Sequence, residues 1–373
     1  MKIYRAYKFR MYPTKEQAIM LNKFLGTSRF IYNHYLNEKD NRYKNGENFT
    51  LKNMCADLNI LQNEYTWLQE IDSCILRTAI FNLDDAYTRY FNKQTSHPKY
   101  KKKTYLNSYR TNCIRSTYKN HEYANIKVDL IKRTIKLPKL DEISIKGYRK
   151  LNSFDDKKIL NATVSNVAGK YYVSVCVEED IQVNDFILNN IIGLDLGVKD
   201  IVITSDGIKY KAMQDIKRYE KKLKGLNRWL SRSVKSSNNR MKIIKKIQRV
   251  NEKIRNIRKY YIHLITKDIV SNNDIIVTEN LNVQNMIETS NKSLTKSITN
   301  TSMAEIIRQL KYKSEWQNKK LIQVNTYYPS SQLCSCCGTK EEKVKDLSIR
   351  KWICKKCNNE LDRDINASIN ILM

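Results

Sequence analysis

The sequence predicts an α+β protein of several domains, and three observations carry this prediction. A helical stretch follows a strand at the start of the chain, and strand-forming runs fill the middle of the chain. From about residue 189 onward, strands alternate with helices. Five of the nine cysteines also gather near the C-terminus. A chain of 373 residues is long enough for two or three domains with cores of their own.

The N-terminal region predicts one strand followed by helices. Residues 1–12 alternate basic side chains with apolar or aromatic ones, as a half-buried strand does. Thr14 and Gln17 then have the spacing of a capping box, which marks the start of a helix. Because apolar residues continue at three- and four-residue spacing to about Lys93, we expect helices up to that point, within a helical segment that we assign to residues 13–100.

The middle of the chain predicts a β-unit. The runs 126–137 and 162–179 are strand-like and are separated by turn sequences, as in a small antiparallel or barrel-like unit. The most economical arrangement joins residues 1–12 to residues 101–188 in one β-barrel. Residues 13–100 are then a helical insertion into that barrel.

The C-terminal half predicts a second, mixed α/β domain. Residues 190–210 form two or three strands, and a basic helical hairpin follows at 213–270 with a break at 236–239. Further elements are expected at 274–281 (strand), 302–318 (helix) and 320–328 (strand). An antiparallel hairpin followed by βα units is the layout of an RNase H-like fold. We assign residues 189–329 and 359–373 to this domain.

The charge of the chain indicates a polyanionic partner. Lysine and arginine number 68 against 38 acidic residues, so the net charge is +30. Residues 217–259 alone hold 17 lysines and arginines against two glutamates. Such a surplus favours nucleic acid, because neutralised phosphates release counterions. No run approaches 18 apolar residues and no signal peptide is visible, so we expect a cytoplasmic protein with no membrane partner.

Four cysteines have the spacing of a zinc site. Cys334 and Cys337 form one CxxC pair, and Cys354 and Cys357 form a second pair after sixteen intervening residues. This spacing falls in the zinc-ribbon range, and four thiolates close the coordination shell of one structural Zn²⁺. We expect residues 330–358 to form this ribbon as an insertion into the α/β domain. Cys336 is left over, and its exchange with one ligand of the first pair stays open.

Three carboxylates lie on predicted core elements, where their negative charges need a compensating partner. Asp195 lies within an apolar strand, Glu279 ends another, and Asp364 begins a helical stretch. Burying an unpaired charge is costly, and a pair of Mg²⁺ ions would offset that cost and support phosphodiester hydrolysis. The alternative of an actin-like ATPase fits the Gly-Leu-Asp-Leu-Gly run only superficially, because no later glycine-rich phosphate loop is present.

From end to end, the sequence resembles the TnpB family of transposon-encoded, RNA-guided DNA endonucleases, which are related to the type V CRISPR effectors. The motifs occur in family order: YRAYKFRMYPTKEQ, IIGLDLGVKDIVITSDG, IIVTENLNVQNM, QLKYKSEW, YYPSSQLCSCCG, CKKC and DRDINASINIL. The resemblance implies a RuvC-like nuclease domain and a wedge-like barrel whose insertion holds recognition helices. It also implies that Asp195, Glu279 and Asp364 form the metal-binding triad, whereas Asp362 caps the last helix.

The same resemblance implies the partners. A guide RNA from the transposon end pairs with the target strand of double-stranded DNA, and the protein recognises a short flanking motif. Thr111 and Asn112 match a family position that contacts this motif. We expect a monomer within the ribonucleoprotein, located at the nucleoid of a prokaryote when bound to DNA. Two alternatives stay open: a nuclease-silent, RNA-guided DNA-binding repressor, and a guide-free structure-specific nuclease.

Overall fold

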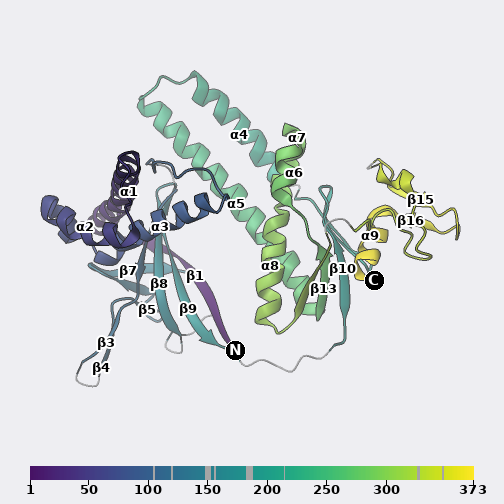
Figure 1. Cartoon of the computed structure of the whole chain (residues 1–373), viewed down its shortest axis with the longest axis horizontal. Helices are drawn as coiled ribbons and strands as arrows, with labels where there is room; N and C mark the ends of the chain where they lie inside the picture. The colour runs from purple at the N-terminus through teal and green to yellow at the C-terminus, as the bar shows by residue number, and fades with distance from the viewer. Residues whose placement is uncertain are drawn as a thin grey trace. The chain divides into compact units, whose positions relative to one another are not determined.

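The chain forms two compact units, Met1–Ile181 and Gln182–Met373, called unit 1 and unit 2. The computed structural model describes all residues except 104–105, 119–120, 148–152, 155–156, 182–187, 214, 326–327 and 347. Figure 1 labels the elements of both units. Within the described part of the chain, no helix combines the length and the apolar character that a membrane span requires.

Unit 1 begins with the predicted strand and helix. The strand β1 (Lys2–Tyr12) turns alternate side chains inward, as expected for period-two hydrophobicity. Its buried side chains are Ile3, Tyr7, Phe9 and Met11. The helix α1 (Lys15–Lys44) begins with the predicted capping box: the hydroxyl of Thr14 accepts from the N–H of Gln17 at 3.2 Å, and the side-chain oxygen of Gln17 accepts from the N–H of Thr14 at 3.0 Å.

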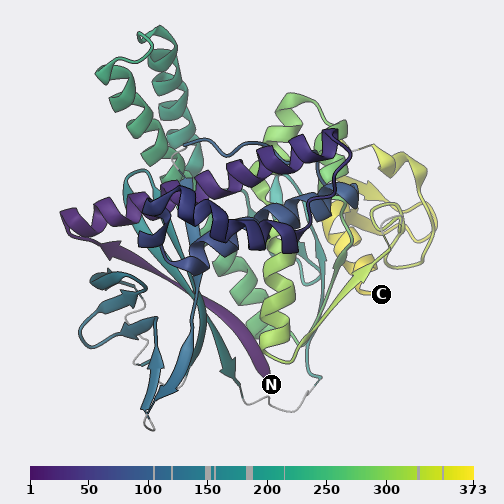
Figure 2. The ribbon, with the colours of Figure 1, turned by 60° about the vertical axis from the view of Figure 1, so that its left-hand side comes forward.

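Three helices of unit 1 share a core with its large sheet. After α1 come α2 (Leu51–Glu64), a 3₁₀ turn (Thr66–Glu70) and α3 (Ser73–Phe91). Figure 2 shows these purple and blue helices lying across the sheet. The buried side chains of α1 and α3 belong to the same apolar cluster as those of β1 and its neighbours. Burial of this common core holds the helices on the sheet.

The sheet of unit 1 is antiparallel, with strand order β2-β8-β9-β1-β7-β6-β5. Its remaining strands are β2 (Leu106–Asn112), β5 (Lys127–Asp129), β6 (Thr134–Leu137), β7 (Leu140–Lys146), β8 (Lys158–Val167) and β9 (Lys170–Asp180), and a separate hairpin is formed by β3 (Arg115–Tyr118) and β4 (His121–Ala124). Among the described residues no ladder joins β2 to β5. In the part of the chain that the structure describes, the sheet is therefore open in hydrogen-bonding terms, whereas the sequence predicts a barrel.

Each of the two predicted strand-like runs of unit 1 is a hairpin. In the first, the carboxylate of Asp129 accepts from the N–H of Lys132 at 2.8 Å, and Arg133 has a left-handed φ of 55°. In the second, Gly169 has a φ of 80°, which a glycine adopts without steric cost. These turns fold β5 onto β6 and β8 onto β9.

Unit 2 is built on a mixed five-stranded sheet of order β12-β11-β10-β13-β14. Its strands are β10 (Ile191–Asp195), β11 (Asp200–Thr204), β12 (Lys209–Lys211), β13 (Ile275–Glu279) and β14 (Lys320–Val324). The first three pair antiparallel, and β10, β13 and β14 pair parallel. The last strand is shorter than the predicted 320–328, of which residues 326–327 lie outside the described part.

The helices of unit 2 are α4 (Asp215–Arg232), α5 (Asn238–Asn272), α6 (Val283–Thr289), α7 (Lys292–Thr301), α8 (Met303–Trp316) and α9 (Arg363–Leu372). Of these helices, α5 and α8 pack on one face of this sheet, and α9 contacts β10, β11 and β13. The predicted basic hairpin is α4 and α5, which lie side by side in Figures 1 and 2. The buried apolar residues in the second half of α5 and those of α8 form one apolar cluster with Ile192 and Leu194 of β10 and Ile276 of β13.

The cysteine region lies between β14 and α9. A 3₁₀ turn (Glu342–Lys345) and the two-stranded sheet of β15 (Lys351–Ile353) and β16 (Glu360–Asp362) form its framework. We call residues 330–362 the cysteine module. It has a small apolar cluster of its own, formed by Val344, Trp352, Cys334 and Cys354.

Candidate metal centres

Asp195 and Glu279 stand at the carboxyl ends of neighbouring parallel strands. The register pairs Ile192 with Ile276 and Leu194 with Thr278, so the two acids follow the last of these pairs. Successive side chains of a strand point to opposite faces. Because Leu194 packs in the cluster with α5 and α8, Asp195 lies on the opposite face, and the same alternation puts Glu279 beside it.

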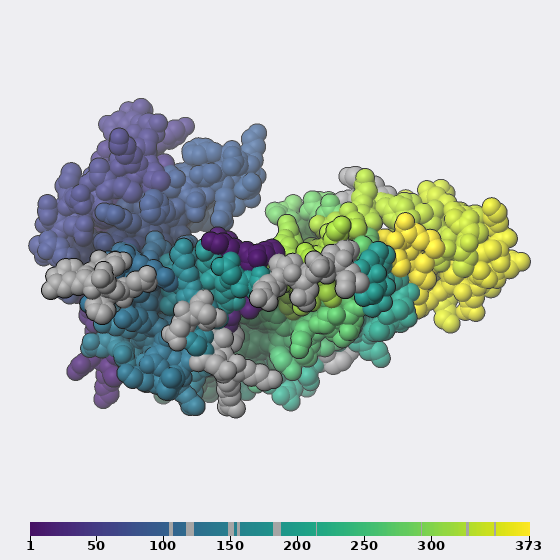
Figure 3. All heavy atoms as spheres, turned by 90° about the horizontal axis from the view of Figure 1, so that it is seen from below, coloured from purple at the N-terminus to yellow at the C-terminus, as the bar shows by residue number. Residues whose placement is uncertain are grey.

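Gly193 lets α9 approach that opposite face very closely. A Cβ atom on Gly193 would lie 2.1 Å from the carbonyl oxygen of Ser368 and 2.9 Å from the Cβ of Leu372, both on α9. Figure 3 shows the yellow atoms of the C-terminal residues against the teal atoms of the strands near residue 200. Since Asp364 lies one turn before Ser368, this contact brings the first turn of α9 to the acidic end of the sheet.

The three carboxylates interact electrostatically. The pKa of Asp195 is raised to about 7, first by burial and then by the negative charges of Glu279 and Asp364. Burial and like charges both disfavour the ionised form of a carboxyl group. Three residues that are far apart in sequence therefore form one acidic site, which a cation would stabilise.

Protein groups also hold two of these acids. The hydroxyl of Ser330 donates to Glu279 Oε1 at 2.6 Å. A guanidinium nitrogen of Arg350 lies 3.3 Å from each carboxylate oxygen of Asp364, but the Arg350 side chain is 52% exposed. An ion pair this exposed contributes little stability, so it leaves Asp364 available to other cations.

Asp362 has the capping role that the sequence predicts. Its carboxylate accepts from the backbone N–H groups of Asp364 at 3.1 Å and Ile365 at 3.2 Å, at the start of α9. It also pairs with Lys209 at 2.7 Å. Burial acts to raise the pKa of Asp362, but the contact with Lys209 and the backbone donors outweigh burial and lower it. Asp362 therefore orients the helix that holds Asp364.

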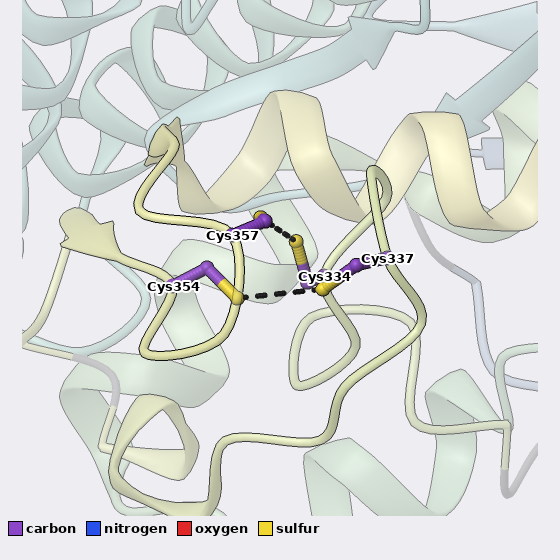
Figure 4. Close-up of side chains that lie close together, drawn as sticks. All are labelled: Cys334, Cys337, Cys354 and Cys357. Atoms are coloured by element: carbon purple, nitrogen blue, oxygen red, sulfur yellow. Dashed lines mark hydrogen bonds between the residues drawn. The ribbon is translucent and has the colours of Figure 1, made fainter.

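The four predicted cysteines form a compact cluster. The sulfur atoms of Cys334 and Cys357 are 3.6 Å apart, those of Cys337 and Cys354 are 3.5 Å apart, and all four lie within 4.8 Å of one another (Figure 4). Elsewhere in the described ranges, no three histidine, cysteine or acidic residues bring their ligand atoms this close. The three carboxylates thus form a wider site than the cysteines do.

The cysteine cluster fits a tetrahedral metal ion. Four sulfurs at about 2.3 Å from Zn²⁺ lie about 3.8 Å from one another, close to the spacings found here. The two CxxC turns have matching geometry: Gly338 N–H donates to the carbonyl of Cys334 at 2.8 Å, and Asn358 N–H donates to that of Cys354 at 2.9 Å. Gly338 and Asn358 both have positive φ values, 71° and 55°.

Two of the cysteine thiols favour the thiolate form that binds metal. The hydroxyl and the backbone N–H of Thr339 lower the pKa of Cys337 to about 6. The backbone N–H groups of Cys357 and Lys356 lower the pKa of Cys354. Cys336 is exposed and lies outside the cluster, so the structure groups the ligand set without it.

Comparisons with known proteins bear on the whole chain. Three family models match: "Helix-turn-helix domain" over residues 1–48, "Probable transposase" over 174–290, and "Cas12f1-like, TNB domain" over 304–371. The Escherichia coli K12 protein named "Putative RNA-guided DNA endonuclease InsQ" is 30% identical, with 100% of this chain and 92% of that protein covered. The chain belongs to the TnpB family.

Other relatives agree with membership of the TnpB family. A Streptomyces pristinaespiralis protein named "Putative RNA-guided DNA endonuclease" is 29% identical, with 100% of this chain and 89% of that protein covered. A solved structure entitled "Cryo-EM structure of the Cas12f1-sgRNA-target DNA complex" matches with a TM-score of 0.54 and 13% identity, covering 100% of this chain and 99% of that one. At 13% identity, the match to the solved structure shows similarity of fold alone.

One family description differs from the structure of this TnpB chain. The model described as a helix-turn-helix domain covers residues 1–48. Here those residues form one strand, β1, and one unbroken helix of 30 residues, α1. The segment therefore contributes an inner strand of the sheet, paired with β9 and β7, and one long helix, and it contains no pair of helices.

The two residues expected at the flanking DNA motif have different environments. Thr111 is 1% exposed, and its hydroxyl donates to the carboxylate of Asp72, which caps α3. Thr111 thus ties β2 to α3 and does not present its side chain to solvent. Asn112, the next residue of the strand, is exposed, as alternation along a strand requires.

Some residues of these sites were not predicted from the sequence. Gly193 is one of only nine glycines and directly precedes the Leu-Asp of β10, so its position was a usable signal. Ser330, Asn366 and Asn370 had no such signal. They act through partners that are distant in sequence, and only the packed structure identifies those partners.

Proposed function

We propose that this TnpB family member is an RNA-guided DNA endonuclease that hydrolyses phosphodiester bonds beside a short flanking motif. Asp195, Glu279 and Asp364 would hold two divalent metal ions in an RNase H-like, RuvC-type domain. The observation that carries the proposal is that the three acids lie close enough for the charges of Glu279 and Asp364 to raise the pKa of Asp195. The names of the E. coli and Streptomyces relatives support the same activity.

The chemistry of the donor set agrees with Mg²⁺. Carboxylate oxygens are the ligands that this hard cation prefers. Bound there, two such ions would activate a water and stabilise the leaving oxygen of the phosphodiester. The chain itself supplies rigid positions for the three acids: two strand ends in register, and a helix capped by Asp362.

The zinc site would have a structural role. Four cysteine sulfurs would fill the coordination shell of one Zn²⁺ and leave no position for water. The apolar cluster of the cysteine module is small, so the metal would supply much of the folding free energy of this segment.

The basic surface of unit 2 would bind the phosphates of the nucleic acids. The helices α4 and α5 hold most of the 17 lysines and arginines between residues 217 and 259. One groove along α4 is lined by Lys217, Lys221, Lys224 and Arg228 together with Lys296. A cationic groove of this kind attracts phosphates whatever the sequence, which suits a protein whose specificity comes from a paired guide RNA.

The flanking DNA motif needs an exposed polar reader. We retain Asn112 as the candidate, because its side chain is exposed. Thr111 would contribute indirectly, through its contact with Asp72. The active species would be a monomer of the chain in complex with one guide RNA.

The test is cleavage by the protein purified with RNA transcribed from its own transposon end. A plasmid library with randomised flanks beside the guide-matched target is incubated with the complex and Mg²⁺. We expect linear product for a subset of flanks, and Asp195→Ala should bind the same targets and cut none. Binding without cutting by the native protein would favour the nuclease-silent repressor. Cutting that survives RNase treatment would favour a guide-free nuclease.

A further inference from the structure

The cysteine module is attached to α9 through two asparagines. Asn366 and Asn370 lie one turn apart on the same side of α9, and they are 1% and 4% exposed. The side-chain N–H groups of Asn370 donate to the carbonyls of Ser330 and Leu333, both at 2.7 Å. Asn366 donates to the carbonyl of Leu333 at 2.6 Å and accepts from the N–H of Ser335 at 2.9 Å.

These contacts use both donors of Asn370, and they use the Asn366 amide as donor and as acceptor. An amide side chain has two N–H donors and one carbonyl acceptor. Both donors of Asn370 are used, and Asn366 serves as donor and acceptor at once, which fixes the orientation of its amide. The segment from Ser330 to Ser335, which includes the first cysteine of the first pair, is therefore held to α9 by four buried or partly buried hydrogen bonds.

The same segment contacts the acidic site. Ser330 is 5% exposed, and its hydroxyl donates to Glu279 Oε1 at 2.6 Å while its carbonyl accepts from Asn370. The hydroxyl occupies one of the roughly four lone-pair positions of the carboxylate, so the others stay available to a cation. Ser330 thus lies between a helix that presents Asp364 and a strand that presents Glu279.

We propose that Ser330 is a positioning residue for Glu279, held in place by Asn370, and that it couples the cysteine module to the metal-binding acids. This inference rests on the proposed function, in which Glu279 binds a divalent cation. Groups that hydrogen-bond a metal ligand fix its orientation, and their loss typically weakens metal binding or activity by roughly 10- to 100-fold. The module then has a second role besides folding: it supplies the donor that orients one acid.

The test measures Mn²⁺ binding by electron paramagnetic resonance, on the full chain in complex with its RNA. Ser330→Ala removes the hydroxyl and little volume, and it should raise the Mn²⁺ dissociation constant of the acidic site about tenfold. Ser330→Thr keeps the hydroxyl and should restore most of the affinity. Ser331→Ala is the matched control, because the neighbouring serine takes part in none of these contacts, and it should bind as the native protein does.

Cleavage is then measured against metal concentration. For Ser330→Ala we expect the half-maximal concentration of Mg²⁺ or Mn²⁺ to rise about tenfold. A purely structural role would lower activity without this shift. Asn370→Ala should shift the metal dependence in the same direction while the zinc content stays at its native level.

Two outcomes overturn the proposal. One is native Mn²⁺ affinity and native metal dependence in Ser330→Ala. The other is a loss that Ser330→Thr fails to restore. If the native complex binds Mn²⁺ but cuts no DNA, the proposed function fails, whereas the binding comparison among the serine variants still decides the positioning role.

Discussion

Gly193→Ala tests how closely α9 must approach the strand that holds Asp195. The added Cβ would lie 2.1 Å from the carbonyl oxygen of Ser368, 2.9 Å from Leu372 Cβ and 3.0 Å from the backbone nitrogen of Leu372. Two of these atoms belong to the backbone of α9 and cannot be moved by a rotamer change. The helix itself has to shift, or the strand has to bend.

The size of the shift follows from these distances. Ordinary van der Waals contact begins near 3.4 Å, so the Ser368 oxygen must retreat by about 1.3 Å. Overpacking of this kind costs about 1–3 kcal/mol of stability. Asp364 lies one turn earlier on the same helix and would move with it. A misplacement of about 1 Å can reduce a catalytic rate roughly 100-fold.

The assay combines urea unfolding, followed by circular dichroism, with guide-dependent cleavage. Gly225→Ala is the matched control, because it is the same change within unit 2 at a helical position with nothing within 4 Å of the new Cβ. Alanine in a helix interior is favoured over glycine by about 0.5–1 kcal/mol. The two substitutions should therefore change stability in opposite directions, and only Gly193→Ala should impair cutting.

A Gly193→Ala protein with native stability and native cleavage would refute this reasoning. That result would mean that α9 does not contact β10 at the distance described, and that Asp364 does not depend on this contact for its position.

Three further predictions concern the acids and the cysteines. In Mg²⁺-free buffer, the contribution of Asp195 to stability should be fully present below about pH 4 and fall by at most about 4 kcal/mol as pH rises to about 7. The reason is that the unfolded chain ionises Asp195 near its ordinary pKa of 3.8, whereas the folded chain does so only near 7. Asp195→Asn should flatten this part of a urea-unfolding series across pH, and an unchanged slope would contradict the assignment. Asp362→Asn should keep the cleavage rate within a few-fold of the native rate, because asparagine caps helices as well as aspartate does. Asp364→Asn should reduce cleavage to background. Equal losses in the two variants would show that the two acids do not have separate roles. Metal analysis should find one zinc ion per native chain and none in the Cys354→Ser variant, and the midpoint of thermal unfolding should be lower in this variant. A variant that lacks zinc but unfolds at the native midpoint would mean that the cluster needs no metal.

Local features of this protein were predictable from sequence because they depend on neighbouring residues. The capping box from Thr14 to Gln17 spans four residues, and helix geometry alone joins its two ends. The helical hairpin was visible from apolar spacing and a polar break. Each CxxC pair is likewise a single turn, so the sequence indicates both halves of the cysteine cluster.

Distant features needed the tertiary structure. The sequence marks Asp195, Glu279 and Asp364 as costly to bury, and family resemblance groups them. Only the parallel register of β10 and β13 puts the first two on the same face, and only the missing side chain of Gly193 lets α9 bring the third. A register shift of one residue would have reversed the face of either strand acid.

The structure also shows contacts of Thr111 and Ser330 that sequence motifs did not predict. Thr111 belongs to a motif expected at DNA, but its strand face packs against α3, so its hydroxyl bonds to Asp72. Ser330 precedes the first cysteine pair without an evident role, and packing brings it to Glu279, 51 positions earlier. The sequence by itself determined which chemical groups are available, because residue type and local spacing are written in it. The fold decided which of them meet, because contacts between distant residues depend on strand register and helix packing.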